Sequence, residues 1–187
     1  QMKKALLFNV ILLLVFIFST VLVFAYETVI IKYPDGELWL RAFYKKYGDE
    51  ALLQYLPKNE TRENWTRSIF VHSYNESAYP VNVFIANNLA LMEKANPTSR
   101  YKYLKLDDND AIATRCTDNY KHIKAQCEFF RVTRAHNGII SLHYVNRDKF
   151  DFKKNYTQWY EIIKRAKYYN TYYRGDRTLD KSEYFEL

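Results

Sequence analysis

The chain has 187 residues, of which 48% are hydrophobic and only four each are glycine and proline. This composition excludes a disordered or linker-type protein and indicates a packed core. Once an N-terminal apolar block is set aside, roughly 160 residues remain, which suffices for one domain that buries about two-thirds of its unfolded surface.

The segment 1–25 is typical of a targeting sequence. Lys3 and Lys4 precede an uncharged apolar run that ends at Ala25. Cleavage after Ala25 would make it a signal peptide, whereas about 20 apolar residues could also span the ~30 Å hydrocarbon layer as an uncleaved anchor. Both alternatives place the chain from Tyr26 onward outside the cytoplasm, because the lysines favour the cytoplasmic side. The protein is then secreted, periplasmic, or anchored in the inner membrane, and we favour a bacterial source.

The first part of the exported region has the pattern of a sheet. Residues 28–31, 51–56 and 67–74 show the apolar and β-branched pattern of strands. Residues 38–44 fit either a helix or a strand, and the pattern leaves both open. In the turn before the third strand, we expect Trp65 to fold inward as an anchor.

The second part alternates helical and strand patterns. An apolar stripe predicts a helix over 80–94, and a C-terminal helix is predicted over 151–169. Four strands are expected between them, at 101–106, 111–116, 125–134 and 139–145. Asn137-Gly138 between the last two is the strongest short-range signal for a hairpin.

This order predicts an α+β domain over residues 26–169, in which two main helices pack on an antiparallel sheet. A mobile tail is expected over 170–187. The element order over Ala51–Tyr169 resembles that of PsbP-like exported domains, which implies a fold and no function. The segment Glu60-Thr61-Arg62-Glu63-Asn64-Trp65-Thr66 is similar to one in small exported bacterial proteins of unknown function.

The two cysteines fit an exported domain. Cys116 and Cys127 are the only cysteines of the chain, and an even pair in an oxidising compartment most often forms a disulfide. We therefore predict a Cys116–Cys127 bridge. Closing so short a loop would stabilise the fold by about 2 to 3 kcal/mol.

The sequence carries no recognisable catalytic motif. It has no G-x-S-x-G elbow, and four glycines leave little for a phosphate-binding loop. An exported hydrolase that uses His136 or His143, with Ser141 or Ser73 as nucleophile, is the alternative hypothesis. The acidic run 107–110 lacks the spacing of a calcium loop and predicts a turn. No metal or cofactor is predicted, and the remaining histidines are His72 and His122.

A basic and tyrosine-rich C-terminal stretch is the candidate binding surface. Without Lys3 and Lys4 the exported part has 26 basic and 21 acidic residues, and tyrosine is common at interfaces. The residues assigned to binding are Lys164, Arg165, Lys167, Tyr168 and Tyr169. Their expected partner is an envelope protein, a membrane complex or an anionic membrane surface, and not nucleic acid.

Together these features predict a non-catalytic exported or membrane-anchored envelope protein. It would bind another envelope component or serve as a subunit of a membrane complex.

Overall fold

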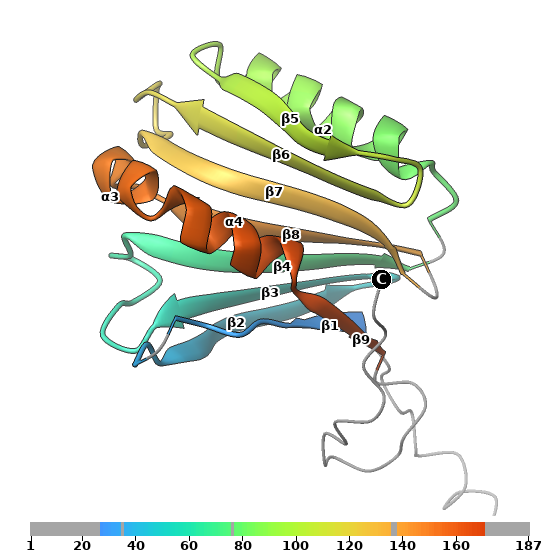
Figure 1. Ribbon diagram of the computed structural model, residues 1–187, viewed down its shortest axis with the longest axis horizontal. Coiled ribbons are helices and arrows are strands. Elements are labelled where there is room, and N and C mark those ends of the chain that lie inside the picture. Colours follow the sequence, from blue (N-terminus) through green and yellow to red (C-terminus); the bar gives the residue numbers. More distant parts are fainter. Residues whose placement is uncertain (1–26, 35, 76, 136–137, 171–187) are drawn as a thin grey trace, which may run out of the picture.

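The computed structural model describes residues 27–34, 36–75, 77–135 and 138–170. Its centre is a seven-stranded antiparallel sheet in the order β2-β3-β4-β8-β7-β6-β5 (Figure 1). The strands of this sheet are β2 Trp39–Tyr47, β3 Glu50–Pro57, β4 Arg67–Asn75, β5 Arg100–Leu106, β6 Asp110–Thr117, β7 Gln126–Ala135 and β8 Gly138–Asn146. A second, two-stranded antiparallel sheet pairs β1 Glu27–Ile30 with β9 Lys167–Asn170.

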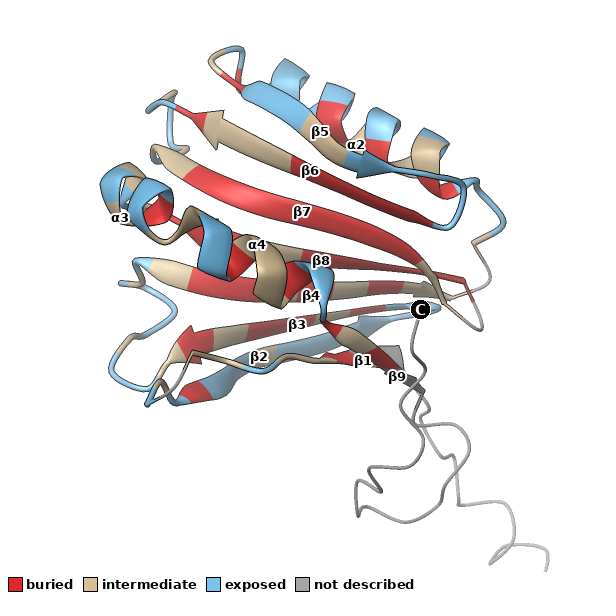
Figure 2. Cartoon of the chain, in the orientation of Figure 1, coloured by how far each residue is buried: buried red, intermediate tan, exposed pale blue. Residues whose placement is uncertain are grey.

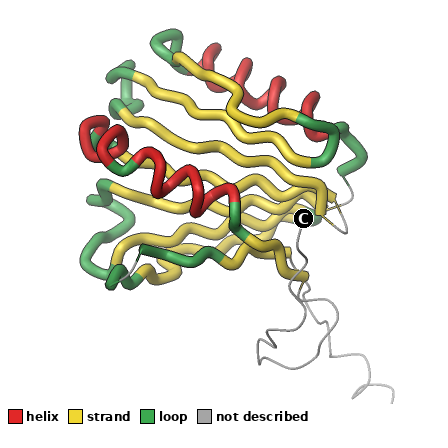
Figure 3. Tube along the Cα trace, in the orientation of Figure 1, coloured by secondary structure: helices red, strands yellow, loops and turns green. Residues whose placement is uncertain are grey.

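Three helices cover the large sheet, namely α2 Val81–Ala95, α3 Lys149–Lys154 and α4 Tyr156–Lys164. Figure 3 shows α2 along the β5 end of the sheet and α3 and α4 across its middle strands. The mixed fold with an antiparallel sheet confirms the predicted α+β class. The segment 38–44, which the sequence left open between helix and strand, lies mostly in β2.

The prediction of one C-terminal helix over 151–169 is wrong. The side chain of Asp148 accepts hydrogen bonds from the amides of Phe150 and Asp151 and so begins α3 early. Asn155 leaves helical geometry and bonds back to Asp151 through its side chain, which separates α3 from α4. After α4 the chain becomes β9, because its backbone pairs with β1.

One face of the sheet carries α3, α4 and the β1-β9 pair. Trp159 of α4 is 1% exposed, stacks on Tyr144 of β8 with ring centroids 3.7 Å apart, and meets Trp39 edge-on. Phe152 of α3 packs against Phe129 of β7. Figure 2 shows the buried residues concentrated on the central strands beneath these helices. This face therefore holds the larger core.

The opposite face carries α2 alone among the described helices. Val81, Ile85 and Leu89 of α2 are fully buried against a second core. Its sheet side includes Ala111 and Ala113 of β6, whose small side chains let the helix approach closely. α2 lies over β5, β6 and β7, and its Phe84 meets Tyr74 near the end of β4 edge-on. The half of this face made by β2, β3, the rest of β4 and part of β8 has no described helix over it.

The targeting segment 1–25 and the tail from residue 171 lie outside the described residues. Asn170, where the tail was expected to start, ends β9. Within the ranges that the structure describes, no helix has the length and apolar character needed to cross a membrane.

Candidate binding face

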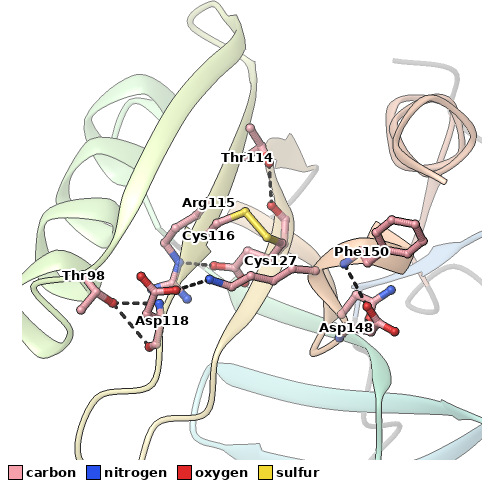
Figure 4. The surroundings of a disulfide bond; sticks show 11 residues. Thr98, Thr114, Arg115, Cys116, Asp118, Cys127, Asp148 and Phe150 are labelled. Carbon is pink, nitrogen blue, oxygen red and sulfur yellow. Dashed lines mark hydrogen bonds and ion pairs between the residues drawn. A yellow bond between two sulfur atoms is a disulfide. The ribbon is translucent and has the colours of Figure 1, made fainter. Parts of the chain in front are cut away.

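The predicted disulfide is present in the structure (Figure 4). Cys116 of β6 and Cys127 of β7 stand directly opposite each other in the strand register, and their sulfur atoms are 2.02 Å apart. Beside them, the hydroxyl of Thr114 donates to the carbonyl oxygen of Glu128. The bridge thus closes the β6-β7 hairpin at the end where its connecting loop begins.

Lys164 and Arg165, which the sequence assigned to binding, lie at the end of α4. Both side chains are exposed, and both form ion pairs with Glu161, at 3.7 Å and 3.2 Å respectively. Ion pairs this exposed contribute little to stability. These two cations remain accessible to a partner.

The other three assigned residues lie in β9 and do not form a helix surface with them. Tyr168 is 4% exposed and belongs to the larger core, and Lys167 is partly buried. Tyr169 pairs through its backbone with Thr28 of β1. The structure therefore does not gather the five residues on one exposed helix face, and Tyr168 is a core residue.

The buried guanidinium of Arg131 explains why β9 lies there. It donates to the carbonyl oxygens of Ile163, Lys164 and Ala166 at the end of α4, and to both carboxylate oxygens of Asp110. Burial alone would raise the pKa of Asp110, but hydrogen bonds led by that from Arg131 outweigh it and hold the pKa below its ordinary value. This network fastens the C-terminal segment to the sheet.

The acidic run 107–110 forms the predicted turn. One carboxylate oxygen of Asp107 accepts hydrogen bonds from the amides of Asn109 and Asp110, and Lys105 pairs with Asp110 at 2.7 Å. The carboxylates are thus occupied by backbone amides and basic side chains. Among the described residues, no group of three or more histidine, cysteine or acidic side chains converges as a metal site.

Two histidine–glutamate pairs lie on the α2 side of the sheet, beyond the helix. His143 of β8 is 3.3 Å from Glu128, which also pairs with Arg115 at 2.6 Å. Burial would raise the pKa of Glu128, but the neighbouring His143 and Arg115 lower it overall. His143 also stacks on Phe130. Its ring therefore contacts Phe130 through one face and Glu128 through Nδ1.

The second pair joins β4 to β3. Nε2 of His72 is 3.1 Å from a carboxylate oxygen of Glu50, and the ring lies 3.9 Å from that of Tyr74. Burial lowers the pKa of His72, and Glu50 offsets only part of this effect. Burial raises the pKa of Tyr74 to about 12.

Neither pair forms the hydrogen-bonded arrangement that a hydrolase needs. Ser141 stands opposite His72 in the register, but its hydroxyl is buried and no hydrogen bond joins the two side chains. The hydroxyl of Ser73 is also buried without a partner. His136 lies outside the described residues, and His122 is exposed in the β6-β7 connection. In the described chain no histidine activates a serine.

The uncovered half of the sheet instead presents aromatic rings covered by cations. The guanidinium of Arg62 lies 4.2 Å from the ring centroid of Phe43, and that of Arg147 lies 3.4 Å from Trp65. In such contacts the electrons of the ring face attract the cation. Trp65 in turn meets Phe70 edge-on, with ring centroids 6.0 Å apart. Trp65, which we expected to fold inward, therefore packs against this half of the sheet.

The β3-β4 loop is fixed above these rings. The carboxylate of Glu60 accepts hydrogen bonds from the amides of Thr66 and Arg67, which closes the loop that carries Arg62 and Trp65. We call this region the open face and define it by its lining side chains, which are Leu40, Phe43, Lys45, Tyr47, Leu52, Arg62, Trp65, Phe70, His72, His143 and Arg147.

The strand register places these side chains together. Phe43, Gln54, Phe70 and His143 follow one another across β2, β3, β4 and β8. At the outer edge Tyr47 is 54% exposed and lies 4.2 Å beneath the ammonium group of Lys45. The sequence could indicate the aromatic strands but not which half of the face a single helix leaves open.

Comparisons with known proteins provide no relative for this arrangement. No family model, no curated protein and no solved structure matches the chain.

Proposed function

We propose that this chain is a non-catalytic exported protein that binds another envelope component through the open face. The observation that carries the proposal is that half of a sheet face has no described helix over it and bears aromatic rings in contact with cations. Exposed aromatic and arginine side chains are typical of interfaces. In the described chain, this face has no serine hydroxyl hydrogen-bonded to a histidine and no metal site. Such a face supports binding better than hydrolysis.

The charges of the open face favour an anionic partner. Arg62, Arg147 and Lys45 all lie on aromatic rings, which favours positive groups at these positions on the face. Two acidic groups of this region have other partners, since Glu50 pairs with His72 and Glu60 accepts hydrogen bonds from loop amides. An acidic surface of another envelope protein meets these requirements, because it can offer carboxylates to these cations.

The disulfide supports a location outside the cytoplasm, where such bridges persist. Whether the protein is free there or is a subunit of a membrane complex depends on the segment 1–25. The intact mass of the protein from its native host, measured without reductant, separates these cases. Loss of a mass equal to that segment means a free protein, and the full mass means a retained anchor.

The binding role is tested by photocrosslinking in the native host. A photoreactive phenylalanine analogue in place of Tyr47, on the open face, should give a crosslinked adduct. The matched control is Leu91 on the outer side of α2, a large apolar residue that is 65% exposed. Arg62→Glu should weaken the Tyr47 adduct severalfold. Equal adducts at both positions, or none at Tyr47, would contradict the proposal.

A further inference from the structure

The outer edge of β2 is a second surface with a defined chemistry. β2 is the end strand of the seven-stranded sheet, and among the described strands only β3 pairs with it. Seven of its nine residues are exposed. An end strand offers backbone amide and carbonyl groups to another strand, so β2 is a place where a partner can extend the sheet.

The register shows which backbone groups face outward. The amide of Lys58 donates to the carbonyl oxygen of Leu38 at 2.8 Å, and Leu40 and Arg41 stand opposite Leu56 and Tyr55. Because hydrogen-bonded pairs alternate in an antiparallel ladder, Leu38 and Leu40 direct their backbone groups toward β3. The register shifts between Arg41 and Phe43, which marks a β-bulge in the middle of β2. An added strand would therefore pair with β2 in two short runs, one on each side of the bulge.

The side chains of β2 select the partner by charge. The strand contains Arg41, Lys45 and Lys46 and no acidic residue. Lys45 is opposite Leu52 and Lys46 is opposite Ala51, and successive residues of a strand point to opposite faces. Cations therefore stand on both faces of the edge, and a complementary strand carries acidic residues on both of its faces.

Apolar side chains accompany these charges. Leu38, Leu40 and Tyr47 are each about half exposed, at 54%, 48% and 54% respectively. Side chains at alternate positions of an added strand would pack against them. The edge thus fits an acidic segment that also contains apolar residues.

We propose that an acidic, extended segment of a partner protein binds along β2 as an eighth strand of the sheet. The inference rests on the proposed binding role and adds how the partner binds. A segment that matches the nine residues of β2 is about 30 Å long. A second copy of the chain fits less well, because antiparallel self-pairing centred on Phe43 would place Arg41 opposite Lys45 and set like charges together.

The test uses the full chain and four synthetic peptides of nine residues, each capped at both ends. The first has glutamates on both faces of the strand and valines elsewhere, and the second has lysine in place of glutamate. The third and fourth repeat these two peptides with alternate backbone amides methylated, which keeps the charges but removes half of the donors needed for strand pairing. Binding is measured by titration, and hydrogen exchange locates the bound peptide.

The acidic peptide should bind at least tenfold more tightly than the lysine peptide and protect backbone amides of β2 from exchange. Methylation of the acidic peptide should abolish its binding. The double variant R41E/K45E should reverse the preference between the two unmethylated peptides. The matched control is Lys102→Glu, which changes an exposed lysine on β5, the other end strand, and should leave the preference unchanged.

Three results would overturn strand addition. They are equal binding of methylated and unmethylated acidic peptides, absence of binding, and self-association of the wild-type chain that R41E/K45E alters. If β2 stays unprotected while the Tyr47 crosslink forms, strand addition fails and the binding role stands. If peptides bind β2 but no crosslink forms in the host, the proposed function fails instead.

Discussion

The two faces of the large sheet are completed in different ways. On one face, α3, α4 and the β1-β9 pair bury rings such as Trp159 and Tyr144 almost fully. On the other, α2 covers one half, and the open half is lined by partly buried rings such as Phe70 and Trp65. The first face therefore holds the larger described core, and half of the second lies clear of the described helices.

The polar groups of the two faces differ in the same way. The charges on the α4 side fasten chain segments together, as Arg131 does for the end of α4. Those on the open half pair across neighbouring strands or lie on rings, as His72 and Arg62 do. On the half without a described helix, such local contacts hold the side chains.

The sharpest test of this difference compares one ring from each face. Trp159→Ala removes a fully buried ring and should lower the free energy of unfolding by about 3 to 5 kcal/mol. Phe70→Ala, on the open half, should cost roughly 1 to 2 kcal/mol, because that ring is only partly buried. Urea denaturation of both variants measures this. An equal loss in the free energy of unfolding for both variants would mean that the open half contributes as much to stability as the α4 side.

The Arg131 network predicts the next largest effect. Arg131→Met removes the guanidinium donor from three carbonyl groups and from Asp110, which keeps only Lys105 and Thr133, and should cost about 3 kcal/mol at pH 7. Because the pKa of Asp110 is lowered, its contribution is present above the unfolded pKa of 3.8 and is lost as pH falls through the lower folded value.

The variant should therefore lose less stability than the wild type when the pH drops from 5 to 2. Urea midpoints at several pH values measure this. Thr114→Val, also on β6, serves as the control and should keep the wild-type acid dependence. Identical acid dependence in wild type and Arg131→Met would contradict the assigned role of the pair.

The third prediction concerns how much the disulfide adds to the free energy of unfolding. Cys127 is buried in the core beneath α3 and α4, and the bridge closes a loop of eleven positions. Reduction should cost about 2 to 3 kcal/mol by restoring freedom to the unfolded chain. Unfolding with and without reductant measures it, and a Cys116→Ser, Cys127→Ser variant should show no response to reductant. A reductant effect in that variant would assign the loss to another cause.

The strands of the large sheet could be predicted from the sequence because their signals are local. Runs such as Ile69 to Tyr74 alternate along the chain, and the cysteine pair needed only an even count and an exported domain. The end of the C-terminal helix could not be found in this way. Tyr168 and Tyr169 suit a helix or a strand, and pairing with β1, at the far end of the described chain, decides for the strand.

The open face was hidden for a related reason. Phe70, His72 and Tyr74 alternate with Ile69 and Val71, so both faces of β4 have side chains that a core would accept. Only tertiary packing determines that α2 lies over β5, β6 and β7 and meets β4 at the contact between Phe84 and Tyr74. No sequence pattern indicates that Arg62 contacts Phe43 or that Arg147 contacts Trp65.

The smallest expected effect concerns His72 on the open face. Burial lowers its pKa below the ordinary 6.5, so the folded chain binds fewer protons than the unfolded chain just below that pH. Stability should therefore fall as pH drops through 6.5 and level off below the folded pKa. His72→Gln should remove less than about 1 kcal/mol of this dependence, since the pair with Glu50 is partly exposed. His122→Gln, at an exposed position, is the control. If His72→Gln instead steepens the loss between pH 7.5 and 5, protonated His72 stabilises the fold, and the open face would be held together by charge more than by burial.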